Sequence, residues 1–525
     1  MAPTIVMNLR RSVMNPRRSV MNLRRSVINQ KRRLSAFTML GMMTASSFFF
    51  VSTPYANQDP ENADLFIQPT ALEQLRAELT QSLETSGAYD YELLEPLNNL
   101  TAALIADESY NEANALIEQQ IQVLRINHGL YTPTQIELVK QQLGVLAAAK
   151  DWEQIFDRMT YLTHILERSE NMPVTDRLAH IKEVRNWSRL LLARGPRVQE
   201  PNYLLQLQAL EEMALDVARS SLEPGPELQQ LIYERALAEL YIALGIVATS
   251  DTSRQLLSRS EGIETPDFRR NQVITTVSDL EAVFGARAST VIDRSHRNVM
   301  NRHQQMIKSL ADSAGGDPDD ALDELSETDP EQAAMIQLYM GDSVLLRQQY
   351  ELRMGSHTGP QRGSSAAGSA AGYYRTAWSL LLKAGHTEQA LNDYFSCPTL
   401  LPAGKFETTL AGLPRRCTTE EETGELLLPD VAIIRDGVPG LRYENLPETG
   451  RIGTAAGTLA TLQFHVGMNG QPDRINITAS VPDNAGARIQ GKAALETLQF
   501  RPALRDGRPI RSSPVVVKLY SLESG

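Results

Sequence analysis

The chain has 525 residues, enough for two to four domains, and its 42% hydrophobic and 22% charged residues are ordinary for a globular protein. Nine basic and no acidic residues lie in residues 1–33, so the net charge of −12 becomes −21 (42 basic and 63 acidic residues) for the remainder. A surface that acidic repels phosphate backbones, which argues against a nucleic acid partner.

The N-terminal basic residues come from a short repeated motif. Residues 7–34 read MNLRRSV, MNPRRSV, MNLRRSV and INQKRRL. A coiled-coil heptad needs two continuous apolar stripes, and Pro16 breaks the pattern here. We interpret the segment as a duplicated basic leader, and Met21 would serve equally well as the first residue.

Residues 1–56 as a whole have the order of an export signal. The basic residues are followed by residues 34–51, an uncharged and mostly apolar stretch. This order predicts a secretory signal peptide that is cleaved before Asn57. Pro54 is a poor residue for a cleavage site, and the stretch is near the lower limit for spanning a bilayer, so an uncleaved membrane anchor is the alternative.

Helical periodicity dominates residues 71–312, and the first part of this region repeats. An apolar stripe that includes Leu97 and Leu100 is followed by a turn and by a second helix that opens at Tyr110. The same order of helix, turn and helix recurs 42 residues later, where Trp152 takes the place of Tyr110. A fixed period of this kind predicts a solenoid of helical hairpins.

The repeat resembles tetratricopeptide repeats of the longer, 42-residue kind, although Ile155 occupies a position where a small alanine is usual. The resemblance implies an α-solenoid in which each helix buries one apolar face against its neighbours.

Two later segments predict breaks in the helical region. Residues 313–331 are acidic and contain two glycines and two prolines, so we expect a flexible linker there. Residues 332–395 predict further helical hairpins, interrupted by the low-complexity insertion 355–372. Residues 396–456 are then expected to form a linker to the C-terminal part.

Cys397 and Cys417 are the only cysteines, and they flank a proline-containing segment of this linker. In an exported protein two such cysteines are expected to form a disulfide, which would contribute about 3 kcal/mol by closing the loop. A metal pair and free thiols are the alternatives, and the lack of a nearby histidine speaks against metal.

Residues 457–525 predict a small α+β module. Two stretches of period-2 alternation, Thr458–Val466 and Arg474–Val481, enclose a turn and predict a hairpin. Pro514–Tyr520 predicts a final strand. A helix is expected between the hairpin and this strand, and its apolar positions are Ile489, Ala493, Ala494 and Leu498.

The module resembles the C-terminal domain of TonB-like proteins. The phrases that carry the resemblance are Phe464-His465-Val466, Asn469-Gly470, Lys492-Ala493-Ala494-Leu495, Phe500-Arg501-Pro502-Ala503 and Asp506-Gly507-Arg508-Pro509. From Gln332 onward, the phrases MGD, YYRTAWSLL and FSCPTLLP resemble periplasmic proteins in which tetratricopeptide-like helices run into such a domain. The resemblance implies a periplasmic module that binds other proteins.

The same resemblance implies that a partner binds as a strand added to a sheet edge. We expect the edge to be the last strand, with Val515, Val517 and Leu519 packed inward. The binding residues predicted on its outward face are Val516, Lys518 and Tyr520. Lys518 could instead simply protect the edge from aggregation.

No motif predicts catalysis, a cofactor or a metal site. The segment from Gly486 to Ala493 nearly matches a phosphate-binding loop but lacks the hydroxyl residue that holds magnesium. His296 and His303 lie two turns apart on one predicted helix face without a third ligand, and we interpret them as solvated side chains.

The expected fold class is therefore mainly α, an α-solenoid of tetratricopeptide-like hairpins followed by a small α+β TonB-like domain. The predicted function is a non-catalytic periplasmic scaffold whose partners are other cell-envelope proteins, outer-membrane receptors among them. The alternative is an energy transducer anchored in the inner membrane, although residues 34–51 lack the histidine, and the chain lacks the Pro-rich spacer, that such transducers usually carry. An enzyme acting on cell-wall or peptide material is a third hypothesis.

Overall fold

The computed structural model describes residues 70–196, 199–248, 288–312, 317–353, 364–413, 417–419, 426–428, 431–433 and 457–521. The chain divides into two units, Met1–Gln68 and Pro69–Gly525, and every described residue lies in the second. The predicted leader and signal segment therefore lie outside the described residues. None of the helices in the described ranges combines the length and apolar character needed to cross a bilayer.

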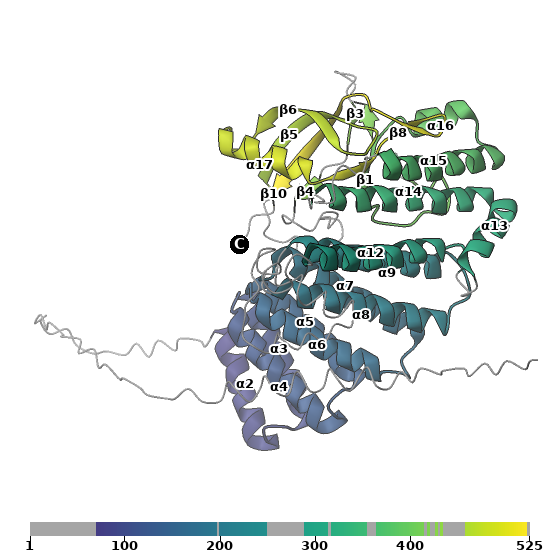
Figure 1. The fold of residues 1–525 in the computed structure, drawn as a ribbon. Coiled ribbons are helices and arrows are strands. Elements are labelled where there is room, and N and C mark those ends of the chain that lie inside the picture. The colour runs from purple at the N-terminus through teal and green to yellow at the C-terminus, as the bar shows by residue number, and fades with distance from the viewer. Residues whose placement is uncertain are drawn as a thin grey trace, which may run out of the picture. The chain divides into compact units, whose positions relative to one another are not determined.

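The first helices repeat with the predicted period (Figure 1). After α2 (Ala71–Ser86), two units follow, each made of a 3₁₀ turn and two α-helices, and each element of the second unit begins 42 residues after its counterpart. These elements are η1 (Tyr91–Leu93), α3 (Leu94–Ala106), α4 (Tyr110–His128), η2 (Pro133–Gln135), α5 (Ile136–Ala148) and α6 (Trp152–Arg168).

The turn between the two helices has the same backbone geometry in both units. Glu108 and Lys150, which are also 42 residues apart, adopt φ values of 59° and 60°, a region that residues other than glycine rarely occupy. In both turns the following amide donates to the end of the preceding helix, Ser109 to Leu104 and Asp151 to Leu146, each at 2.9 Å. The 42-residue period is therefore a structural period over these two units.

Further helices continue the body, and from α7 to α15 each packs against the next described helix. They are α7 (Val174–Arg194), α8 (Glu200–Arg219), α9 (Pro226–Ala248), α12 (Ala288–Lys308), α13 (Pro318–Thr328), α14 (Pro330–Arg353), α15 (Ser364–Lys383) and α16 (Glu388–Tyr394). Their buried apolar side chains, with those of α2–α6, form one hydrophobic core. The described part of the chain is therefore mainly helical, as predicted, up to a small C-terminal strand region.

Two segments of this body that we expected to be non-helical contain helix in the described residues. The predicted acidic linker 313–331 contains α13, because Asp317 caps it, Pro318 suits its first turn, and acidic residues there complement the helix dipole. The predicted insertion 355–372 overlaps the start of α15 at Ser364, because its alanine-rich second half is a good helix former.

The predicted linker 396–456 also contributes strands. These are β1 (Thr399–Leu401), β2 (Thr418–Thr419), β3 (Leu426–Leu427) and β4 (Val431–Ile433). The module adds β5 (Gly457–Val466), β6 (Pro472–Ser480), α17 (Ala485–Glu496), β7 (Gln499–Arg501), β8 (Ala503–Arg505), β9 (Arg508–Ile510) and β10 (Val515–Ser521). The predicted order of strand, strand, helix and strand is present as β5, β6, α17 and β10, with three short strands inserted before β10.

The main sheet has the order β2-β3-β10-β5-β6, with β4 also paired to β10. β10 runs antiparallel to β5 and parallel to β3 and β4. α17 packs on β5 and β6 over a second hydrophobic core that contains Leu462, Phe464 and Leu495.

Candidate functional site

The predicted edge strand lies in the interior of the sheet. β10 pairs with β5 on one side and with β3 and β4 on the other, so the prediction that it offers an open edge is wrong. The short strands of residues 426–433, which we expected to be linker, cover it. Val515, Val517 and Leu519 are buried in the module core as predicted.

The three predicted binding residues of β10 do not form one exposed face. Val516 is only 7% exposed, and its carbonyl accepts a hydrogen bond from the Leu428 amide at 2.8 Å. Lys518 is exposed, and the side chain of Tyr520 lies outside the described residues.

Among the described strands, β6 is the outer strand at the other end of the sheet, because it pairs only with β5. Ile475 and Ile477 are half-buried and pack against the module core, whereas Asn476 and Thr478 are exposed. Two features interrupt the start of the strand. Pro472 has no backbone N–H, and Arg474 has a positive φ of 50°. The pairing with β5 also shifts by one residue at Thr478, so Asn476–Ile477 and Ala479–Ser480 are the paired parts of the edge.

α17 lies beside this edge and presents an unexpected apolar side chain. Asn484 caps the helix by accepting a hydrogen bond from the Ala487 amide at 2.9 Å. Ala494 and Leu498 are buried as predicted, but Ile489 is 70% exposed and Ala493 is also exposed. The apolar positions chosen from the sequence span two faces of the helix, and only one of them packs on the sheet.

The module is joined to the helical body by a buried ion pair. Arg501 on β7 donates from Nε to Asp342 Oδ1 at 2.8 Å and from a terminal nitrogen to Oδ2 at 2.5 Å. Tyr374 on α15 donates its hydroxyl to the same carboxylate at 2.9 Å. Burial opposes the charge on Arg501, but attraction to Asp342 outweighs it and raises the pKa of the guanidinium.

Two glycines allow close approach at this junction. A Cβ on Gly341 would lie 2.5 Å from the Tyr374 ring, so glycine lets α14 and α15 pack closely beside Asp342. Gly507, with a φ of +70°, lies in the turn between β8 and β9 and packs against Trp378 of α15. The MGD, YYRTAW and DGRP phrases of the sequence therefore meet in space.

The segment between the two cysteines runs from this junction across the helices. Cys397 and Cys417 form a disulfide, as predicted, with their Cα atoms 5.9 Å apart. Within the loop, the Ala403 carbonyl accepts a hydrogen bond from Tyr233 at 2.7 Å, and the Lys405 carbonyl accepts one from Tyr339 at 2.8 Å. β1, at the start of the loop, pairs antiparallel with β7.

The centre of the helical body contains buried charges that sequence reasoning missed. Arg185 on α7 is ion-paired with Glu211 on α8 and Glu234 on α9. Burial raises the pKa of Glu211, although Arg185 opposes this. Arg302 of α12 contacts Glu239 of α9 at 3.2 Å. No motif marks these residues, because they come from four different helices.

The interpretation of His296 and His303 as solvated is wrong. Both are buried in α12, at 1% and 3% exposure. Nδ1 of His303 lies 2.7 Å from the carbonyl oxygen of Ala236. Burial, with a smaller effect from Arg347, lowers the pKa of His296 to about 3, so its imidazole is neutral at physiological pH.

The described residues contain no cluster of three or more side chains that could hold a metal ion. A surface cleft of about 470 Å³ opens between α5, α6 and α7. Its lining includes Glu137, Arg168, Asp176 and His180 together with apolar Ile136 and Met172.

No protein-family model matches the chain, and a search of curated proteins finds no match. The resemblances to tetratricopeptide repeats and to TonB-like domains therefore remain predictions from the sequence.

Proposed function

We propose that the chain is a non-catalytic interaction scaffold of the bacterial periplasm. In this proposal the helical hairpins form a tetratricopeptide-like α-solenoid, and the C-terminal TonB-like module binds another cell-envelope protein by strand addition. Outer-membrane receptors are among the candidate partners. The disulfide between Cys397 and Cys417 supports an oxidising compartment.

The outer position of β6 is the observation that carries this proposal. An outer strand has backbone donors and acceptors that can pair with an extended segment of another protein. Asn476, Ile477, Ala479 and Ser480 pair with β5 on either side of a register shift at Thr478, and the adjacent Val481 is 59% exposed. β6 thus takes the role that the sequence had suggested for β10.

Site-specific photo-cross-linking in intact cells tests the proposal. A photoreactive phenylalanine analogue would replace Asn476 or Thr478, both exposed on β6, and Lys518 on interior β10 would serve as the matched control. We expect positions 476 and 478 to cross-link one and the same partner segment, because both side chains are exposed on the outer strand. Cross-links from position 518 alone would contradict strand addition at β6.

The energy-transducer alternative depends on residues 34–51, which lie outside the described residues. Mass spectrometry of the N-terminus of protein recovered from soluble and membrane fractions separates the two functions. Soluble protein that begins near Asn57 supports the scaffold, whereas membrane-bound protein that retains residues 34–51 supports the transducer.

A further inference from the structure

Large hydrophobic side chains that are exposed in the described ranges fall into two groups. One group comprises Tyr89, Tyr91, Ile126 and Leu130, each between 52% and 54% exposed, at the loops of the first repeat. The other comprises Val481 and Ile489, which are 59% and 70% exposed and lie just before and on α17, whereas Met468, 64% exposed, lies apart in the turn between β5 and β6. Single exposed apolar residues are common, but grouped ones mark interaction surfaces.

The first group, here called the tyrosine face, lies on segments that contact one another. The Tyr91 ring contacts His128 edge-on at 5.4 Å, and the Asn127 amide donates to the Tyr89 carbonyl at 3.0 Å. These contacts join the loop after α2 to the end of α4, on which Ile126 lies. The Leu130 carbonyl accepts a hydrogen bond from Tyr161 at 2.6 Å, which ties the face to α6.

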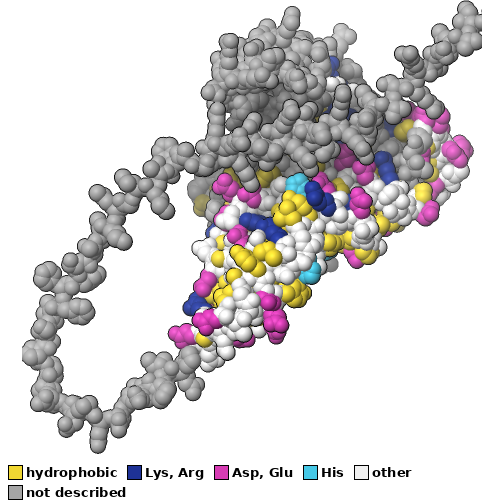
Figure 2. Space-filling model, turned by 90° about the horizontal axis from the view of Figure 1, so that it is seen from below, with side chains coloured by type: hydrophobic (Ala, Val, Ile, Leu, Met, Phe, Trp, Pro, Cys, Tyr) yellow, Lys and Arg dark blue, Asp and Glu magenta, His cyan; other side chains and the backbone are white. Residues whose placement is uncertain are grey.

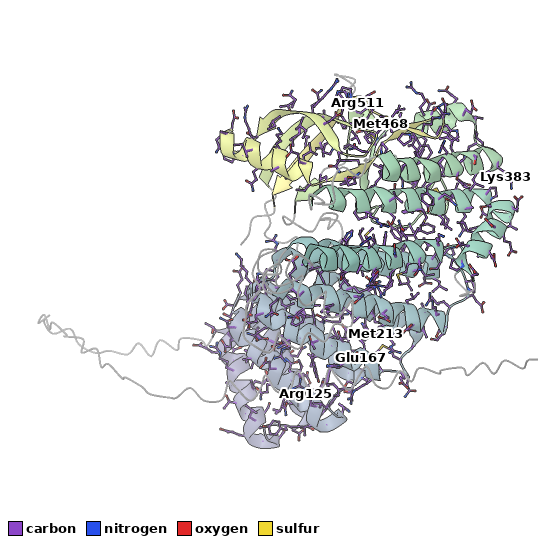
Figure 3. The ribbon with its side chains drawn as sticks, viewed as in Figure 1. Arg125, Glu167, Met213, Lys383, Met468 and Arg511 are labelled. Atoms are coloured by element: carbon purple, nitrogen blue, oxygen red, sulfur yellow. A yellow bond between two sulfur atoms is a disulfide. The ribbon has the colours of Figure 1, made fainter. Side chains whose placement is uncertain are left out.

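The helices that carry the tyrosine face are acidic as a whole. The helices of residues 71–168 contain 15 acidic and 6 basic residues, and Asp90 and Glu92 flank Tyr91 directly. Of the basic residues, Arg125 is stacked on the Tyr161 ring at 4.4 Å and Arg168 on the Tyr131 ring at 4.5 Å. Figure 2, which views the α2–α4 end, shows hydrophobic side chains with both acidic and basic ones around them. Figure 3 labels Arg125 on α4 and Glu167 on α6, one basic and one acidic residue of these helices.

The second surface, here called the α17 face, has the opposite character. It consists of Arg488, Ile489, Lys492 and Ala493, four exposed residues on one side of α17. Residues 457–521 contain eight basic and four acidic residues, so the module carries +4 on a strongly acidic chain. Arg488 pairs with Asp483 at 2.7 Å, and Lys492 lies 3.8 Å from Glu496. Exposed pairs of this kind are weak and can exchange partners.

We propose that the α17 face of one copy docks on the tyrosine face of a second copy. Apolar Ile489 would be covered by exposed tyrosine and aliphatic side chains, and the basic module would meet acidic helices, which favours association and orients it. Figure 1 shows α2–α4 and α17 separated by the intervening helices, so one copy cannot satisfy both faces itself. The contact is therefore head-to-tail, and it can extend to further copies.

This inference does not rest on strand addition at β6.

Sedimentation velocity of the mature, disulfide-bonded protein tests the proposal over a range of concentrations at low and high salt. We expect the mean mass of the wild type to rise with concentration, and more strongly at low salt. The tyrosine-face variant Ile126→Ser/Leu130→Ser and the α17-face variant Ile489→Ser/Lys492→Glu should each associate about tenfold or more weakly, because each removes one side of the contact.

Mixing the two variants identifies the head-to-tail contact. Each retains the face that the other lacks, so an equimolar mixture should form a one-to-one complex that does not grow further. The control Met468→Ser/Lys405→Glu changes an exposed apolar residue and an exposed lysine outside both faces and should behave as wild type. A wild type that is monomeric throughout, or variants that do not associate on mixing, would overturn the proposal.

Discussion

Arg501 and Asp342 lie 159 residues apart in the sequence and form a buried, bidentate ion pair. Asp342 belongs to α14 of the helical body and Arg501 to β7 of the module, so this contact sets the position of the module on the helices. Tyr374 completes the site from α15, and burial together with Asp342 raises the pKa of its phenol well above the usual value. The phenol therefore stays protonated and remains a donor to the carboxylate.

We predict that Asp342→Ala lowers the free energy of unfolding by about 3–5 kcal/mol, because it leaves Arg501 buried without its counterion. The double variant Asp342→Leu/Arg501→Met should cost less than the single change, since it removes both charges. Urea unfolding of the two variants checks this. A double variant that is less stable than Asp342→Ala would show that the pair is not the dominant contact.

Gly341→Ala should lower the free energy of unfolding by about 1–3 kcal/mol, because the added methyl group overlaps the Tyr374 ring. Gly372→Ala is the matched control, since it lies in α15 with open space around it and should raise stability by about 0.5–1 kcal/mol. Thermal unfolding of both variants gives the comparison. Equal effects would rule out the steric explanation.

Replacing both cysteines, as Cys397→Ser/Cys417→Ser, should cost about 3 kcal/mol of stability, because the unfolded chain is no longer constrained. Reductant should destabilise the wild type by the same amount and leave the variant unchanged. Denaturant unfolding with and without reductant measures both effects. A reductant effect on the variant would show that reduction destabilises the protein by a route other than this disulfide.

Because His296 is buried, we predict that the free energy of unfolding falls as the pH is lowered. Its folded pKa of about 3 lies below the unfolded value of 6.5, so the unfolded state binds the proton more readily. Stability should therefore be fully present above pH 6.5 and decline below it, by up to about 1.4 kcal/mol per pH unit from this group.

Urea unfolding between pH 7 and pH 5 checks this, before most carboxylates titrate. The His296→Gln variant should show a flatter dependence, whereas His164→Gln, at a half-exposed position, should keep the wild-type slope. Parallel slopes for wild type and His296→Gln would contradict the assignment.

Local patterns predicted the helical units well. Tyr110 and Trp152 begin α4 and α6, and the 42-residue offset between them recurs in every element of the two units. Helix periodicity and turn position are local properties of the sequence, so they could be recognised without knowing the tertiary structure. The hairpin of β5 and β6 was predictable for the same reason.

Long-range pairing could not be predicted in this way. Val516 was expected to face solvent because β10 follows all other strands in the chain, yet the short strands near residues 426–433 cover it. His296 and Glu211 are buried only because separate helices enclose them. Ile489 was expected in the core and is exposed, because an alanine-rich helix offers two candidate faces.

The central place of β10 has a consequence for how the chain is made. β10 follows β3, β4 and β5 in the sequence but lies between them in the sheet. The β5–β6 hairpin cannot be joined to β3 and β4 until residues 515–521 have been synthesised. Loss of these few residues to a premature stop codon or a protease would divide the sheet and expose Leu462 and Phe464. Such a chain would be a ready target for proteolytic quality control.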